Sequence, residues 1–241
     1  MKKSKPVLTL ALTGGFGSGK SSALKAFAQM GAATFDCDAI ARDLTAGRGP
    51  LVARIGRLFG GGVLDASGRL DRAKTASLIF NNPSRRRRLE ALLHPAILTE
   101  LSKRLANSKA ALRVVEVPLL FENEKKLLKR RPLYDASLTV WASPETIRRR
   151  LSAKGWTKDD IERRRSSQMP LDEKCCKADF ILDNNGARQK LTGQVRAIQN
   201  ACQAILRDYR EARKQRGKGE AANDKRTGNQ RARRRNRTPY E

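Results

Sequence analysis

Residues 14–21 constrain this chain more than any other stretch of its sequence. They read Gly-Gly-Phe-Gly-Ser-Gly-Lys-Ser and fit the spacing G-x-x-x-x-G-K-S/T. An apolar, β-prone run over residues 7–12 precedes this loop, and a helical pattern over residues 22–30 follows it. A strand that leads through a glycine loop into a helix aims backbone N–H groups and the helix dipole at one point, which favours bound phosphate. The pattern therefore predicts a P-loop nucleotide site rather than a glycine-rich turn beside a chance lysine.

The residue types in this loop divide the tasks of phosphate binding. Lys20 adds a positive charge for the β- and γ-phosphates, and the Ser21 hydroxyl can bind the accompanying Mg²⁺. The glycines let the backbone approach the ligand without a Cβ in the way. The predicted ATP- and phosphate-binding residues are Gly15, Gly17, Ser18, Gly19, Lys20, Ser21 and Ser22. The dinucleotide-binding spacing fails, because Lys20 stands where its third glycine would be.

Five β-prone runs, at residues 7–12, 32–35, 112–117, 136–141 and 179–182, alternate with helical patterns. This alternation predicts an α/β, P-loop NTPase-type three-layer fold with a parallel five-stranded sheet, a helical substrate-binding insertion and a small helical lid. We expect a nucleotide-binding core of residues 7–48, 110–142 and 175–209, an acceptor-binding insertion of 49–109, a lid of 143–174 and a basic disordered tail of 210–241. An apolar stripe in the insertion continues past Pro95, which predicts a kink or break near His94.

The charge balance is strongly basic. The formal net charge is +27, and residues 207–241 carry thirteen Lys or Arg against five Asp or Glu. Such a chain attracts polyanions, so a second hypothesis is a nucleic-acid-associated protein, or an enzyme with non-specific polyanion contact through its tail. The tail lacks interleaved aromatic residues, so we expect any such binding to be phosphate-driven and salt-sensitive, with a solvated charge run as the alternative.

The cysteine pattern and the short apolar segments of the sequence indicate the cellular compartment of the protein. The four cysteines show no C-x-x-C spacing, which suggests reduced thiols. The apolar run near the N-terminus is too short for a signal peptide and leads into the phosphate loop. No segment reaches the ~20 apolar residues of a membrane span. We therefore expect a cytoplasmic protein with no membrane association.

Two carboxylates follow the second predicted strand. In a doubly wound sheet, Asp36 and Asp38 would lie at the carboxyl edge, beside the phosphate loop. Side chains alternate along an extended segment, so the side chains of Asp36 and Asp38 would lie on the same face. One could then orient an acceptor hydroxyl while the other accepts its proton. The alternative is that both aspartates cap the helical pattern that follows.

The predicted lid is rich in arginine. A capping Ser143 before Pro144 starts one helix, and Gly155 ends it before Thr157 caps another. Basic residues crowd positions 148–165. A kinase needs a mobile cationic lid over the transferred phosphate, whereas a solvated helix face would explain the same charges.

Five motifs in order resemble those of the dephospho-CoA kinase family, and the likeness spans residues 7 to about 209. They are the phosphate loop at 14–22, Asp-Cys-Asp at 36–38 with Ile-Ala-Arg at 40–42, Leu-Leu-His-Pro at 92–95, Val-Pro-Leu-Leu-Phe-Glu at 117–122 and Asp-Asn-Asn-Gly at 183–186. The resemblance implies transfer of the ATP γ-phosphate to the ribose 3′-hydroxyl of dephospho-CoA, the last step of CoA biosynthesis. Other P-loop nucleoside or nucleotide kinases are the alternative.

The resemblance also implies residue roles. Asp38 is the general base, with Lys20 and Arg150 as further catalytic residues, and the insertion binds CoA. The implied acceptor-binding residues are Asp36, Asp38, Arg42, His94, Pro118 and Leu119. For His94, a purely structural role is the alternative.

Two positions depart from the family pattern. Glu116 stands where the family commonly has aspartate, so its contact with Mg²⁺ could pass through a water molecule. Lys154 stands where a second lid arginine recurs beside Arg150. Lysine lacks the planar fork of arginine, which puts bidentate phosphate contact at this position in doubt.

Overall fold

The computed structural model describes residues 6–80, 82–123 and 133–235, with side chains described as far as residue 212. The strands are β1 (Leu8–Gly14), β2 (Ala33–Asp36), β3 (Leu112–Glu116), β4 (Ala136–Trp141) and β5 (Phe180–Asp183). The helices are α1 (Lys20–Gln29), α2 (Cys37–Leu44), α3 (Pro50–Phe59), η1 (Gly61–Val63), α4 (Arg72–Phe80), α5 (Pro83–Asn107), α7 (Pro144–Ser152), α8 (Lys158–Ser166), α9 (Leu171–Lys177) and α10 (Arg188–Arg235).

The five strands form one parallel sheet in the order β2-β3-β1-β4-β5, which confirms the predicted sheet. The central strand β1 is buried along its whole length. Leu12 and Asp36 are both register partners of Glu116, on opposite sides of β3. The P-loop that follows β1 and the carboxylates of β2 and β3 therefore lie at one edge of the sheet.

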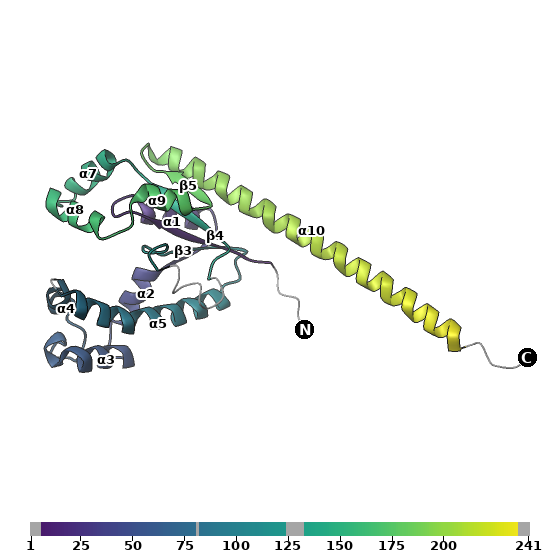
Figure 1. Ribbon diagram of the computed structural model, residues 1–241, viewed down its shortest axis with the longest axis horizontal. Coiled ribbons are helices and arrows are strands. Elements are labelled where there is room, and N and C mark those ends of the chain that lie inside the picture. Colours follow the sequence, from purple (N-terminus) through teal and green to yellow (C-terminus); the bar gives the residue numbers. More distant parts are fainter. Residues whose placement is uncertain (1–5, 81, 124–132, 236–241) are drawn as a thin grey trace, which may run out of the picture.

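Helices cover both faces of the sheet, which confirms the predicted three layers (Figure 1). On one face, α1 and α10 pack on alternate residues of the strands, with Phe27, Leu138 and Val195 fully buried. On the other face, α2 and the second half of α5 pack against Val115. The loop that follows β3 covers Ala11 on the same face as Val115.

The insertion has an apolar cluster of its own, formed by α3, η1, α4 and the first half of α5. The helix α5 continues through Pro95, so the break that the sequence predicts near His94 is wrong. Proline removes one N–H from the ladder, but Leu89 packs in the insertion and Leu101 packs beside the sheet. Packing on both sides of Pro95 holds one continuous helix, which joins the insertion to the core.

The lid consists of short capped helices. Ser143 accepts a hydrogen bond from the Thr146 N–H and starts α7, and Thr157 accepts one from the Asp160 N–H and starts α8. These caps confirm the helix starts that the sequence predicts.

The last helix is longer than the sequence indicates. α10 continues as helix to Arg235 and projects from the body, so the disorder predicted for residues 210–241 is wrong as far as that residue (Figure 1). Its final turns follow intrinsic propensity, because the segment is rich in Ala, Arg, Lys, Gln and Glu. Residues 236–241 lie outside the described part of the chain. No described helix is both long enough and apolar enough to cross a membrane.

Candidate active site

The P-loop connects β1 to α1 through three glycines with positive φ. Gly14, Gly17 and Gly19 have φ of 150°, 78° and 97°. The Lys20 ammonium lies back over the loop and donates to the carbonyl oxygens of Gly14 at 3.2 Å and Gly15 at 3.1 Å. Burial lowers the pKa of Lys20, and the charge of Glu116 opposes that shift. A partly buried ammonium whose described hydrogen bonds all go to neutral carbonyls is suited to exchange them for phosphate oxygens.

The loop closes against the turn after β5. Asn184 Nδ2 donates to the Ser18 carbonyl at 2.7 Å, so an element late in the chain fixes the centre of the loop. A Cβ added to Gly19 would lie 2.0 Å from the same nitrogen. The loop therefore requires glycine at position 19 for its backbone conformation and for its contact with Asn184.

Gly19→Ala is expected to weaken ATP binding by at least about tenfold and to destabilise the fold by about 1–3 kcal/mol, because strain and displacement of Asn184 add together. Calorimetric titration with ATP and chemical unfolding would measure the two effects. Gly31→Ala is the matched control, since Gly31 has a φ of 87° but open space around its Cβ position. Equal effects in the two variants would contradict the role of the contact.

Two buried polar atoms beside the loop have no hydrogen-bond partner in the described structure: Ser18 Oγ and Arg150 Nη1. Arg150 comes from α7 of the lid, and its Nη1 lies 3.9 Å from the position that a Cβ would take on Gly19. Orphaned donors are costly when buried, so they indicate a place for an anion.

The hydroxyls of Ser21 and Ser22 are exposed at the start of α1. Lys154 is also exposed and makes no described contact with the loop, so its phosphate role stays a prediction.

The two aspartates after β2 do different things. The Asp36 carboxylate caps α2 by accepting from the N–H groups of Asp38 at 2.8 Å and Ala39 at 3.0 Å. The predicted shared face is wrong, because the extended segment ends at Asp36 and Asp38 lies in the first turn of the helix. Capping is thus correct for Asp36, while the Asp38 carboxylate makes no hydrogen bond or ion pair within the described residues. Partial desolvation, followed by the charge of Asp36, raises the pKa of Asp38.

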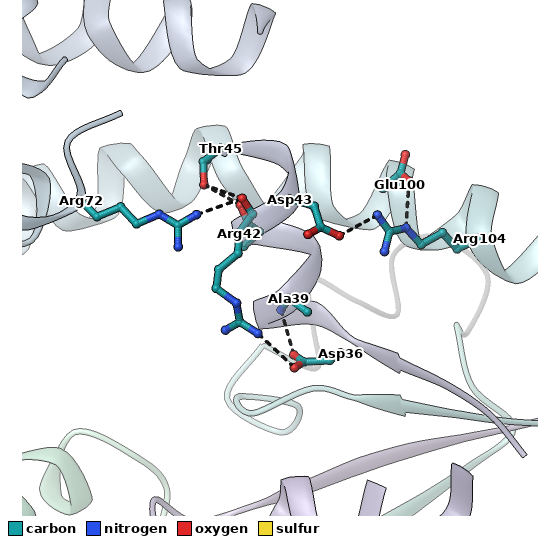
Figure 2. Close-up of polar contacts among 9 residues, drawn as sticks. Asp36, Ala39, Arg42, Asp43, Thr45, Arg72, Glu100 and Arg104 are labelled. Atoms are coloured by element: carbon teal, nitrogen blue, oxygen red, sulfur yellow. Dashed lines mark hydrogen bonds and ion pairs between the residues drawn. The ribbon is translucent and has the colours of Figure 1, made fainter. Parts of the chain in front are cut away.

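Helix α2 is fastened to the insertion by arginines (Figure 2). Arg104 of α5 pairs with Asp43 at 3.1 Å, and Arg72 of α4 donates to the Arg42 carbonyl at 3.0 Å. The Arg42 side chain points to Asp36, at 3.5 Å. The base of the insertion therefore holds the helix that carries Asp38, and Arg42 lies beside these carboxylates as an acceptor-binding residue would.

Glu116 ends β3 at the same edge of the sheet. Its side chain is buried, and Oε2 has no hydrogen-bond partner in the described part of the chain. Burial raises the pKa of Glu116 to about 7, against the opposing charge of Lys20. The described residues contain no cluster of three or more His, Cys, Asp or Glu side chains able to hold a metal ion. Mg²⁺ needs only one or two protein oxygens beside phosphates and water, so Glu116 and Ser21 fit this ion.

The raised pKa predicts a pH dependence of stability without Mg²⁺. Between pH 4.5 and about 7 the folded protein keeps a proton on Glu116 that the unfolded chain has released. The contribution to the free energy of unfolding is therefore complete below pH 4.5 and is lost as the pH rises through about 7. Glu116→Gln should remove this part of the dependence in urea unfolding measured across that range. An unchanged pH dependence in the variant would contradict the raised pKa.

The remaining predicted acceptor residues lie on two elements. Pro118 and Leu119 follow β3, and the Pro118 carbonyl accepts from Thr13 Oγ1 at 3.2 Å and from Lys174 Nζ at 3.1 Å. His94 lies in the middle of α5, and the described residues give it no hydrogen bond or ion pair. The structure thus brings Pro118 next to the P-loop strand, while a role of His94 in acceptor binding stays a prediction.

The contacts that join the lid to both halves of the molecule carry no signal in the sequence. The Arg164 guanidinium of α8 lies over the rings of Phe16, at 5.1 Å, and Trp156, at 4.6 Å. The neighbouring Arg163 lies over the ring of Phe80 in the insertion, at 5.4 Å. Periodicity could not reveal these pairs, because each joins positions remote in sequence. The burial of Lys174 also carries no signal in the sequence, because this residue lies within a short polar helix.

The five-stranded parallel sheet carries a P-loop after β1. The helix after β2 carries Asp38, whose carboxylate is unpaired within the described residues, and an arginine-rich segment follows β4. Together these features define a P-loop kinase. The family model of dephospho-CoA kinase matches residues 8–190. This chain belongs to the dephospho-CoA kinase family.

Curated relatives and solved structures agree with this assignment. A dephospho-CoA kinase of Chromobacterium violaceum is 40% identical over 190 residues, 78% of this chain and 91% of that protein. One from Syntrophotalea carbinolica is 40% identical over 197 residues, 80% of this chain and 90% of that protein. A crystal structure of a Thermus thermophilus protein is 32% identical, with a TM-score of 0.70 over 82% of this chain and 98% of that one. The dephospho-CoA kinase structure from Campylobacter jejuni, at 19% identity, has a TM-score of 0.55 over 80% of this chain and 96% of that one, and supports the fold.

Proposed function

We propose that this protein transfers the γ-phosphate of ATP to the ribose 3′-hydroxyl of dephospho-CoA, giving CoA and ADP in the last step of CoA biosynthesis. The observation that carries the proposal is the family match over residues 8–190, which includes the P-loop, Asp38 and the lid. Another P-loop nucleoside or nucleotide kinase is the alternative.

Each half of the site has a task in this reaction. Lys20 and Arg150 bind the transferred phosphoryl group and stabilise the charge that its oxygens carry in the transition state. Asp38 orients the attacking hydroxyl and accepts its proton as the new O–P bond forms and the bond to ADP breaks. Ser21 and Glu116 would hold Mg²⁺, which neutralises charge on the β- and γ-phosphate oxygens when bound. Arg42, Pro118 and Leu119 would contact the acceptor.

The direct test is an assay of the purified protein with ATP, Mg²⁺ and dephospho-CoA, in which CoA and ADP are quantified by chromatography and mass spectrometry. The expected result is equimolar CoA and ADP, with little turnover on adenosine, AMP or other nucleosides and nucleotides. Preferential phosphorylation of one of these other acceptors would support the alternative kinase instead.

The basic end of α10 suggests an additional property, non-specific polyanion contact. Its support is the charge of residues 207–241, with thirteen Lys or Arg against five Asp or Glu. Among the α10 side chains that the structure describes, which reach residue 212, the last buried one is Leu206, so a chain that stops after Tyr209 keeps its described packing on the sheet.

Truncation after Tyr209 is expected to leave the turnover of dephospho-CoA within about twofold of the full chain. Its affinity for a nucleic-acid duplex should fall, and the dependence of that affinity on salt should flatten, because counterion release decreases with the number of bound cations. Fluorescence anisotropy at several salt concentrations would measure both. Equal affinity and salt slope in the two chains would exclude the tail as the contact.

A further inference from the structure

An ion pair between a fully buried lysine and a partly exposed glutamate lies beside the active site and has no place in the reaction described above. Lys174 of α9 has an exposed fraction of 0%, and its Nζ lies 2.8 Å from Glu122 Oε1. The same ammonium donates to the Pro118 carbonyl at 3.1 Å. Removing the Lys174 ammonium from water costs several kcal/mol, and an apolar side chain of similar size at this position would often be as stable. Stability alone is therefore a weak reason for this pair.

Glu122, the acidic partner, contacts the connection between α8 and α9, which we call the lid root. Glu122 Oε1 also accepts from the Met169 N–H at 3.0 Å, in the connection between α8 and α9. The preceding residue, Gln168, accepts from the Phe16 N–H of the P-loop at 3.1 Å through its Oε1. Two adjacent residues of this connection are thus bonded to the loop after β3 and to the P-loop. Any movement of Glu122 would be transmitted to both contacts.

The basic partner reaches the sheet and the acceptor side. The Pro118 carbonyl that accepts from Lys174 also accepts from Thr13 Oγ1 at 3.2 Å, one residue before the P-loop. Thr139 Oγ1 of β4 donates to the Lys174 carbonyl at 3.1 Å, which fixes α9 on the sheet. Lys174 therefore joins a rigid strand to the loop that carries Pro118 and Leu119. The ion pair therefore connects three parts of the site: the P-loop, the lid and the loop that carries Pro118 and Leu119.

We propose that Lys174 and Glu122 are positioning residues for phosphoryl transfer, whose ion pair sets the lid root, and through it Arg150, relative to the P-loop and the Pro118 loop. The inference rests on the proposed function, since it needs a reaction to position. Neither side chain touches the reacting atoms. Their effect on the rate comes from geometry, because a displacement of about 1 Å at a catalytic group can cost on the order of 10²-fold in rate.

The test uses the full chain with three variants and one control. Lys174→Met leaves the partly exposed Glu122 charge without its partner, whereas Glu122→Gln/Lys174→Met removes both charges. Glu122→Gln alone keeps the acceptor oxygen for Met169 and loses only the charge. Lys177→Met is the matched control, because Lys177 is exposed on the same helix. Thermal unfolding, kcat and the KM for ATP and dephospho-CoA are measured for each.

Lys174→Met should lower both the melting temperature and kcat. The double variant should unfold at a higher temperature than Glu122→Gln, since no buried charge is left alone, yet keep a kcat at least about tenfold below that of the full native sequence. Glu122→Gln should lower the melting temperature, because it leaves the buried Lys174 ammonium without its charged partner, and should lower kcat about threefold to tenfold. Both KM values should change less than kcat in the folded variants, and Lys177→Met should match the native chain.

Recovery of kcat together with melting temperature in the double variant would show that the pair only stabilises the fold, and would overturn the proposal. A native kcat in Glu122→Gln would also overturn it, even if Lys174→Met did not fold. If the native chain itself makes no CoA, the proposed function fails instead. The first measurement therefore separates that failure from failure of the positioning role.

Discussion

Lys20→Ala is expected to lower kcat/KM for ATP by at least about 10³-fold, with most of the loss in kcat. The ammonium is partly buried and bonded to the carbonyl oxygens of Gly14 and Gly15, so it is held inside the loop before any phosphate arrives. Phosphate oxygens would replace these neutral acceptors with charged ones, which form stronger hydrogen bonds. Because negative charge moves toward the bridging oxygen during transfer, the interaction is strongest in the transition state.

Steady-state kinetics and ATP titration would separate the two effects of this variant. Lys25→Ala is the matched control, because Lys25 lies on the same helix with an exposed side chain. We expect native kinetics for the control and an ATP dissociation constant for Lys20→Ala that rises far less than kcat falls. A kcat within about tenfold of the native value would show that Lys20 is not the charge that stabilises the transferred group.

The sheet was predictable because its signals are local. The strand Ala136–Trp141 has the predicted bounds, since an apolar β-prone run is flanked there by polar residues and a capping serine. The continuous α5 was not predictable, because Pro95 breaks helices unless packing on both sides holds them, and that packing depends on tertiary contacts. The extended α10 was not predictable either, because the sequence of its final turns shows no apolar periodicity.

In the candidate site, too, the features with local sequence signals were predictable and those that depend on tertiary contacts were not. The P-loop was recognised because all its residues lie within one short segment, and its contact partner Asn184 belongs to a turn that the sequence also indicates. The separate roles of Asp36 and Asp38 depend on where β2 ends, and a difference of one or two residues reverses the geometry. Lys174 carried no signal, since its helix is polar and only the fold brings Glu122 to it.

Asp38→Asn is expected to lower kcat by about 10² to 10⁴-fold, while the KM for ATP changes little. The carboxylate is free within the described residues, whereas Asp36 is used in the cap of α2. Asparagine keeps the size and can still orient a hydroxyl, but it cannot accept the proton. Desolvation and the charge of Asp36 raise the pKa of Asp38, which strengthens it as a base, so kcat of the native protein should fall as the pH drops through that pKa.

Asp43→Asn is the matched control, because Asp43 lies on the same helix and pairs with Arg104 outside the site. This control tests whether loss of any negative charge on α2 reduces the rate. We expect its turnover to lie within about threefold of the native value, because exposed ion pairs contribute about 1 kcal/mol or less. Rapid-quench measurement of one turnover would place the loss in Asp38→Asn at the transfer step rather than at product release. Near-native turnover in Asp38→Asn would remove Asp38 as the base. The acceptor hydroxyl would then lose its proton directly to solvent or to a phosphate oxygen, which is compatible with a loose transition state.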